Sequence, residues 1–108
     1  MVSRSKYRAQ PTVVDGIRFA SQAEARRYGH LKMLERAGRI YDLELQPRFP
    51  LLVNAIKVCT YVADFRYRFS GVPVPVVEDV KGVQTPIYRL KKKMLLAQDG
   101  IIITEVRA

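Results

Sequence analysis

The fold of this chain is constrained most by residues 61–82, YVADFRYRFSGVPVPVVEDVKG. Apolar and polar residues alternate with a period of two over residues 61–69 and again over residues 76–81, which is typical of β-strands. Between them, Gly71 and Pro73 favour a tight turn. We therefore predict two antiparallel strands joined by this turn. One face of the first strand would carry Tyr61, Ala63, Phe65, Tyr67 and Phe69.

Two acidic residues are expected to meet across these strands. With the turn centred between Gly71 and Val72, Asp64 lies opposite Asp79, with their Cβ atoms about 5 Å apart. Like charges at opposed positions destabilise a sheet, so a bound cation or a raised pKa of one carboxyl group must compensate. A Mg²⁺ ion held by both carboxylates is the simplest solution, because Mg²⁺ binds one or two carboxylates together with water and phosphate. Lys81 shares a face with Asp79 and would bind the reacting water or the phosphate.

These residues resemble the signature of a known nuclease superfamily. Asp64, followed after a turn by Asp79-Val80-Lys81, resembles the D…(D/E)-x-K motif of the restriction-endonuclease-like, or PD-(D/E)xK, nucleases. Glu24 matches the acidic residue that the first helix of such nucleases often adds to the metal site. The resemblance covers residues 21–106. The most similar members are small phage-encoded endonucleases, including Holliday-junction resolvases, and the catalytic domains of transposon end-cutting nucleases.

The chain departs from this pattern at two positions. Ala63 stands where the name of the motif has Pro. Glu78 adds an acid directly before Asp79, and a β-bulge would exchange the roles of these two residues. The motif therefore leaves open which of the two acids belongs to the site.

The resemblance implies an α/β fold with a restriction-endonuclease-like core. Its mixed central β-sheet would be flanked by two helices, in the order helix, three strands, helix, strand, after an N-terminal β-hairpin. The resemblance also implies a Mg²⁺-dependent DNA endonuclease, with Mn²⁺ able to replace Mg²⁺. Such an enzyme would cut four-way or branched DNA as a homodimer in phage recombination or DNA processing. The metal would be held by Asp64, Asp79, Glu24 and the Val80 carbonyl, and Lys81 would position the attacking water.

The net charge of +9 and the pI near 10.1 favour a polyanionic partner, for which nucleic acid is the usual candidate. Cations gather in an N-terminal arm and in the second predicted helix, where they would hold the DNA backbone. These cations are Arg4, Lys6, Arg8, Arg89, Lys91, Lys92 and Lys93. A frayed tail and a solubilising helix face are the alternative interpretations of the two groups. A non-catalytic nucleic-acid-binding module, with the acid–lysine pair as an internal salt bridge, is the alternative function.

The length of 108 residues predicts one domain, divided into a basic arm at 1–10, a hairpin at 11–20 and a core at 21–108. Cys59 is the only cysteine and His30 the only histidine, which excludes an internal disulfide, a thiolate cluster and a His-rich zinc site. A reducing cytoplasm, that of the host if a phage encodes the chain, fits this composition. The sequence has no apolar run near the roughly 20 residues that cross a bilayer, so no membrane partner is expected.

Local signals place the first hairpin and helix. Asp15-Gly16 predicts a hairpin turn. Ser21 and Glu24 form a capping box that begins a helix, and Gly38 ends this helix. Glu24 is therefore either a helix cap or a metal ligand, and the sequence leaves this open.

The remaining elements follow from periodicity and from proline positions. Residues 40–49 alternate and predict a strand that stops near Pro47, with Gln46 facing either the active site or solvent. Pro86 would open the second helix. Residues 101–106 predict a buried final strand. The buried face of the second helix is expected to carry Ile87, Leu90, Met94 and Ala97.

Overall fold

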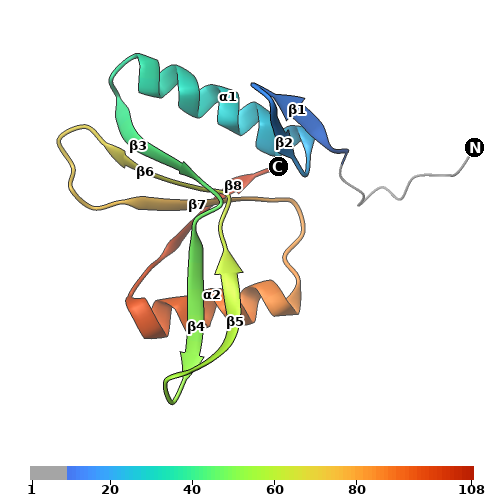
Figure 1. Ribbon diagram of the computed structural model, residues 1–108, viewed down its shortest axis with the longest axis vertical. Coiled ribbons are helices and arrows are strands. Elements are labelled where there is room, and N and C mark those ends of the chain that lie inside the picture. The colour runs from blue at the N-terminus through green and yellow to red at the C-terminus, as the bar shows by residue number, and fades with distance from the viewer. Residues whose placement is uncertain (1–9) are drawn as a thin grey trace, which may run out of the picture.

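The structure is a computed structural model and describes residues 10–108. Two helices and eight strands follow one another along the chain (Figure 1). Their bounds are β1 Thr12–Val14, β2 Ile17–Phe19, α1 Gln22–Arg36, β3 Ile40–Leu45, β4 Arg48–Val53, β5 Ile56–Val62, β6 Phe65–Phe69, β7 Val76–Lys81, α2 Pro86–Asp99 and β8 Ile103–Arg107. Among residues 10–108, no helix is long and apolar enough to cross a membrane.

A four-stranded sheet in the order β3-β6-β7-β8 forms the centre of the molecule. β6 pairs antiparallel with β3 and with β7, whereas β8 runs parallel to β7, so the sheet is mixed. α1 covers one face of the sheet, and α2 with the β4–β5 hairpin covers the other (Figure 1). The predicted α/β class, mixed central sheet, flanking helices and N-terminal hairpin are confirmed. The predicted count of three strands between the helices was wrong, because five strands lie there.

The extra strands arise where the chain leaves one sheet for another. The strand predicted from Ile40 was expected to stop near Pro47, and β3 does end at Leu45, because Gln46 adopts φ 51° and Pro47 has no N–H for a ladder. A further strand, β4, then begins at Arg48. β4 pairs with β5 in a separate two-stranded sheet. Residues 61–69 were predicted as one strand, and they break at Ala63 and Asp64. The break therefore places Asp64 at the junction between the two sheets.

This break also changes the face on which the alternating side chains are buried. Tyr61 and Ala63 pack in the core on the α2 side, whereas Phe65 and Tyr67 pack in the core on the α1 side. The prediction of a single shared face was wrong, because the chain changes sheets while the alternation continues.

The register between β6 and β7 is the one expected from the sequence. Phe65 pairs with Glu78 and Tyr67 pairs with Val76. The connection is a longer loop over residues 70–75 instead of a four-residue turn, yet the paired residues are those that the predicted turn implies. The predicted opposition of Asp64 and Asp79 rests on this register and is confirmed, since Asp64 N–H donates to the Glu78 carbonyl at 3.1 Å.

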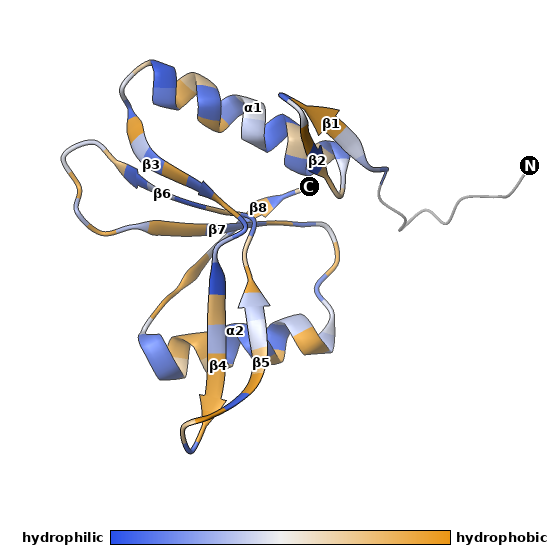
Figure 2. Ribbon diagram, in the orientation of Figure 1, coloured by the Kyte–Doolittle hydropathy of each residue, from blue (hydrophilic) through white to orange (hydrophobic). Residues whose placement is uncertain are grey.

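Capping and turn residues explain the hairpin and α1. Asp15 and Gly16 have φ values of 53° and 74°, which suit a two-residue hairpin turn. The Tyr28 hydroxyl donates to the Asp15 carboxylate at 3.0 Å and ties this hairpin to α1. Ser21 is the N-cap of α1, as expected from the capping box. Hydrophilic and hydrophobic residues alternate along α1 (Figure 2), and its buried residues are Ala25, Tyr28 and Leu31.

α2 and β8 depart from the expected burial. α2 buries Tyr88 and Leu95, whereas Ile87 and Leu90 are 63% and 57% exposed. Met94 packs partly buried against the core, as expected, whereas Ala97 is exposed. The buried face of α2 is rotated relative to the predicted one, because the Tyr88 ring enters the core beside the Tyr61 ring. β8 was expected to be a buried strand, but it lies at the edge of the sheet and only Ile103 is buried along it.

The turn between β4 and β5 contains a strained residue whose replacement should stabilise the protein. Ala55 has φ 65°, a left-handed conformation that disfavours residues with a Cβ atom. Ala55→Gly is expected to raise the free energy of unfolding by about 0.5–1 kcal/mol, measured by urea denaturation. Gly16→Ala, at φ 74° in the β1–β2 turn, is the converse control and should lower it. Destabilisation by Ala55→Gly would contradict this account of the turn.

Candidate active site

Asp64 and Asp79 are held together by hydrogen bonds that cross between their strands. The Asp64 N–H donates to Asp79 Oδ1 at 3.0 Å, and the Val80 N–H donates to Asp64 Oδ2 at 2.7 Å. Each carboxylate is therefore oriented by the backbone beside the other acid. This arrangement requires both the β6–β7 register and the break of the chain at Asp64.

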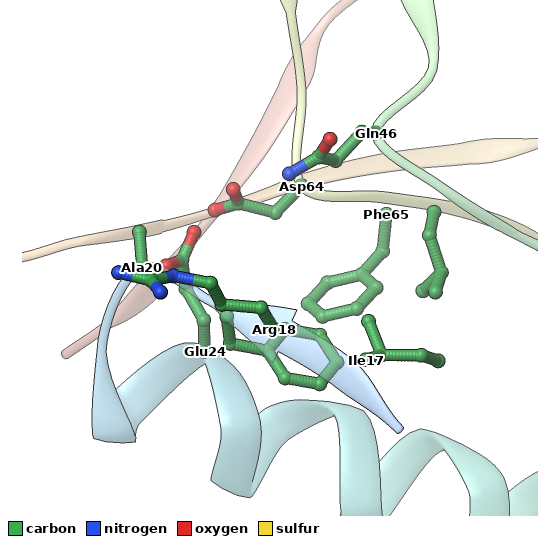
Figure 3. Close-up of a pocket in the computed structure, with 9 residues that line it drawn as sticks. Ile17, Arg18, Ala20, Glu24, Gln46, Asp64 and Phe65 are labelled. Carbon is green, nitrogen blue, oxygen red and sulfur yellow. The ribbon is translucent and has the colours of Figure 1, made fainter. Parts of the chain in front are cut away.

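Glu24 brings a third carboxylate to the same place from the first turn of α1. Its side chain points toward Asp64, and the Gln46 amide approaches Asp64 from the β3–β4 junction (Figure 3). Together they line a cavity of about 110 Å³ with Arg18 of β2. The Ser21 hydroxyl accepts from the Glu24 N–H at 3.1 Å and donates to Glu24 Oε2 at 3.3 Å. Glu24 therefore takes part in capping α1 while its carboxylate faces Asp64, so the two alternatives from the sequence are compatible.

The two aspartates have raised pKa values. Burial, followed by the contact with the Glu24 carboxyl group, raises the pKa of Asp64 to about 7, although the Val80 amide acts in the opposite direction. Burial also raises the pKa of Asp79 to about 6, against the lowering effect of the hydrogen bond from Tyr61. Both groups thus exchange protons near neutral pH, which is common at sites that bind cations or transfer protons.

These raised pKa values predict how the stability of the metal-free protein depends on pH. The folded state holds protons on Asp64 and Asp79 that the unfolded chain has already released, so stability is full at low pH and is lost as pH rises through 6 to 7. Urea denaturation in a chelator should give a lower free energy of unfolding at pH 8 than at pH 5. Asp64→Asn should reduce this difference, and an unchanged difference in that variant would contradict the assignment.

Asp79 also faces a second cavity, on the α2 side of the sheet. The Tyr61 hydroxyl donates to Asp79 Oδ2, and the Asp79 side chain is almost fully buried. The cavity measures about 250 Å³ and is lined by Asp79, Lys81 and Lys91, among others. The Lys81 ammonium lies 4.3 Å from the centre of the Tyr88 ring, in the same cavity. Lys81 and Asp79 therefore share a face, as expected from their spacing.

Glu78 lies on the opposite face of β7 and has a different environment. Its fully buried carboxylate accepts two hydrogen bonds from Arg27, at 2.7 and 2.9 Å, and one from the Tyr67 hydroxyl at 2.7 Å. Asp79, beside Asp64, is thus the acid in the candidate site, and Glu78 belongs to a buried ion pair. The sequence analysis did not identify Arg27, although Arg27 follows Glu24 by three residues and so lies on the same side of α1.

The cations of α2 have different surroundings. Lys91 donates to the Thr60 carbonyl at 3.2 Å, and Lys92 makes an ion pair with Glu105 at 3.0 Å. Arg89 and Lys93 are exposed. Lys91 and Lys92 are only half-exposed, so α2 does not present its four cations as one solvated face. The other predicted cations, Arg4, Lys6 and Arg8, lie outside the described residues.

The donor atoms at the site suit a hard cation. Within residues 10–108, no group of three or more Asp, Glu, His or Cys side chains is arranged to hold a metal ion. Glu24 and Asp64 supply two facing carboxylates, and Mg²⁺ needs only one or two carboxylates besides water and phosphate. The Lys81 carbonyl accepts from Ala108 on the β8 side, so the neighbouring Val80 carbonyl faces the β6 side, where Asp64 lies. An all-oxygen set of this kind fits Mg²⁺ or Mn²⁺ better than Zn²⁺.

Comparisons with known proteins identify a family but no characterised relative. No curated protein and no solved structure matches the chain. The model of the family described as "Protein of unknown function (DUF1064)" matches residues 4–107, so the chain belongs to this family.

Proposed function

We propose that this protein is a Mg²⁺-dependent DNA endonuclease with a restriction-endonuclease-like core. The observation that carries the proposal is that the Glu24 carboxylate faces Asp64, while Asp64 is joined by hydrogen bonds to Asp79 and Val80 of β7. Glu24 comes from α1, Asp64 from the β5–β6 junction and Asp79 from β7. Asp79 is buried, Asp64 and Glu24 are half-buried, and within residues 10–108 none of the three makes an ion pair, so their position beside the two cavities supports a functional role.

The residues around the acids would each have a role in phosphodiester hydrolysis. Asp64 and Asp79, with Glu24 and the Val80 carbonyl, would hold Mg²⁺ or Mn²⁺. The bound ion lowers the pKa of a water molecule and offsets negative charge on the phosphate oxygens. The Val80 and Asp64 N–H groups keep the two aspartates in position. These backbone donors fix the acids before substrate binds, which avoids reorganisation during the reaction.

Lys81 would act on the reacting groups from the α2 side. Its ammonium group lies over the Tyr88 ring in the cavity that Asp79 lines. There it would position the attacking water or stabilise charge on the phosphate as the water oxygen bonds to phosphorus and the bond to the leaving sugar oxygen breaks. Tyr61 donates to Asp79 and would hold this carboxylate in its orientation.

The substrate class follows from the charge of the whole chain. A net charge of +9 supports binding to the sugar–phosphate backbone, which carries no sequence information by itself. We therefore infer selection of DNA structure over base sequence, with a four-way or branched junction as the first candidate. Paired incisions across such a junction imply a homodimer, in phage recombination or related DNA processing.

A second candidate is a non-catalytic nucleic-acid-binding module. The observation that favours it is the burial of Asp79, whose two carboxylate oxygens both accept hydrogen bonds from the protein. In that case the acids would be structural, and the exposed cations alone would bind the ligand.

A panel of labelled DNA substrates tests the proposal. A four-way junction, a linear duplex and a single strand are incubated with the protein and Mg²⁺, and the products are separated on denaturing gels. Paired incisions confined to the junction are the expected result. Equal cutting of all three would retain the nuclease and overturn junction selectivity. Binding without incision of any substrate would favour the binding module.

A further inference from the structure

The carboxylates of the candidate site lie between two cavities. The cavity of about 110 Å³ opens on the α1 side, where Glu24 and Asp64 line it. The cavity of about 250 Å³ opens on the α2 side, where Asp79 and Lys81 line it. The Asp64 N–H donates to Asp79 Oδ1 and the Val80 N–H donates to Asp64 Oδ2, so this hydrogen-bonded pair contributes one acid to the lining of each cavity. A ligand that spans both openings would pass directly over the acids.

Each cavity carries one further cation, from a separate element. Arg18 of β2 lines the first cavity, on the side of Glu24 (Figure 3). Lys91 of α2 lines the second, where its ammonium donates to the Thr60 carbonyl at 3.2 Å. Within residues 10–108, neither cation makes an ion pair with a carboxylate. Both charges are therefore available to an anionic ligand.

We propose that Arg18 and Lys91 bind the backbone phosphates on the two sides of the phosphate that is cut. The polynucleotide strand would thus run from the β1–β2 hairpin, over Asp64 and Asp79, to α2. This inference rests on the proposed nuclease function and assigns the N-terminal hairpin a role in substrate binding. The planar guanidinium of Arg18 can contact two oxygens of one phosphate, whereas the ammonium of Lys91 acts as a point charge.

The surroundings of the two residues support this path. The hydrogen bond between Tyr28 and Asp15 fixes the hairpin that carries Arg18, so the guanidinium is attached to an ordered element. Lys91 is half-buried, and its bond to Thr60 limits its motion beside the cavity. Arg89 and Lys93 line a different groove, with Leu96 and Ile102, away from the acids. The proposed strand path therefore uses Lys91 of α2 and does not use Arg89 or Lys93.

Charge-matched variants test this path. Arg18→Gln is compared with Arg26→Gln, an exposed α1 residue, and Lys91→Gln is compared with Lys57→Gln, an exposed β5 residue; neither control residue lines either cavity. The affinity for a labelled DNA junction is measured in a chelator over a series of salt concentrations. Arg18→Gln and Lys91→Gln should each weaken binding about 10-fold and lower the slope of log affinity against log salt by about 1. The two controls should change affinity by less than about 3-fold, because they remove only distant charge.

The outcomes separate this inference from the nuclease proposal. If the test and control variants lower the affinity for DNA equally, and the protein cleaves DNA, the proposed strand path is wrong and the nuclease proposal still stands. Selective loss of affinity in the test variants, in a protein that cleaves nothing, would support the path and overturn the nuclease. Lys91→Arg should restore most of the affinity, which distinguishes lost charge from a damaged α2, and thermal melting of every variant checks the fold.

Discussion

Asp79→Asn is expected to lower the rate of strand cleavage by about 10³-fold or more. The Asn oxygen can accept from the Asp64 N–H, and its NH2 group can donate to the Tyr61 hydroxyl, which then acts as the acceptor, so the local structure should survive. It removes the negative charge that would help to hold the metal and position its bound water. Single-turnover cleavage of a labelled junction in Mg²⁺ measures the effect without contributions from product release.

The control for this variant removes a carboxylate elsewhere on the surface. Glu35→Gln removes one charge from an exposed pair with Lys32, and its cleavage rate should stay within about 2-fold of the wild type. In a chelator, Asp79→Asn should bind the junction at least as tightly as the wild type, because a negative charge has been removed. Cleavage by Asp79→Asn at the rate of the Glu35→Gln control would exclude Asp79 from catalysis.

Arg27→Met is expected to lower the free energy of unfolding by about 3 kcal/mol, because it leaves the Glu78 carboxylate buried without its cation. Glu78 is fully buried, and Arg27 provides two of the three hydrogen bonds that it accepts from side chains. Glu78 directly precedes Asp79, so the loss would act on the strand that carries the candidate site. Urea denaturation at pH 7 measures the change.

Lys32→Met supplies the matched control on the same helix. Its pair with Glu35 is partly exposed, with 32% of each side chain accessible, so the loss should be below about 1 kcal/mol. Replacing both Arg27 and Glu78 by Met should recover much of the stability lost in Arg27→Met, since no charge then stays buried. An Arg27→Met variant that loses no more stability than Lys32→Met would show that this ion pair contributes little.

Features set by local chemistry could be predicted from the sequence. The Asp15-Gly16 turn and the Ser21 cap act over a few residues, and both are found where expected. The opposition of Asp64 and Asp79 followed from counting outward from a turn between two alternating segments. The loop is longer than the predicted turn, but the strands on its two sides pair in the predicted register.

Other features depend on contacts between distant parts of the chain. Glu78 and its partner Arg27 are 51 residues apart, and no local pattern pairs them. The β4–β5 turn uses Asn54 and Ala55, both at positive φ, without the glycine that normally identifies such a turn. The buried side chains change faces at Asp64, because residues before Asp64 pack on the α2 side of the sheet and residues after it pack on the α1 side. Sequence periodicity alone shows that side chains alternate, and it does not show which side of the sheet they reach.

The dependence of strand incision on divalent ions tests the central claim most directly. One preparation of the protein is incubated with a labelled four-way junction in Mg²⁺, in Mn²⁺ and in a chelator, at equal ionic strength. The account predicts incision in Mg²⁺ and in Mn²⁺ and none in the chelator, because the carboxylates of Glu24, Asp64 and Asp79 need a bound ion to activate water. Incision at the same rate in the chelator, or binding without incision in either ion, would contradict it.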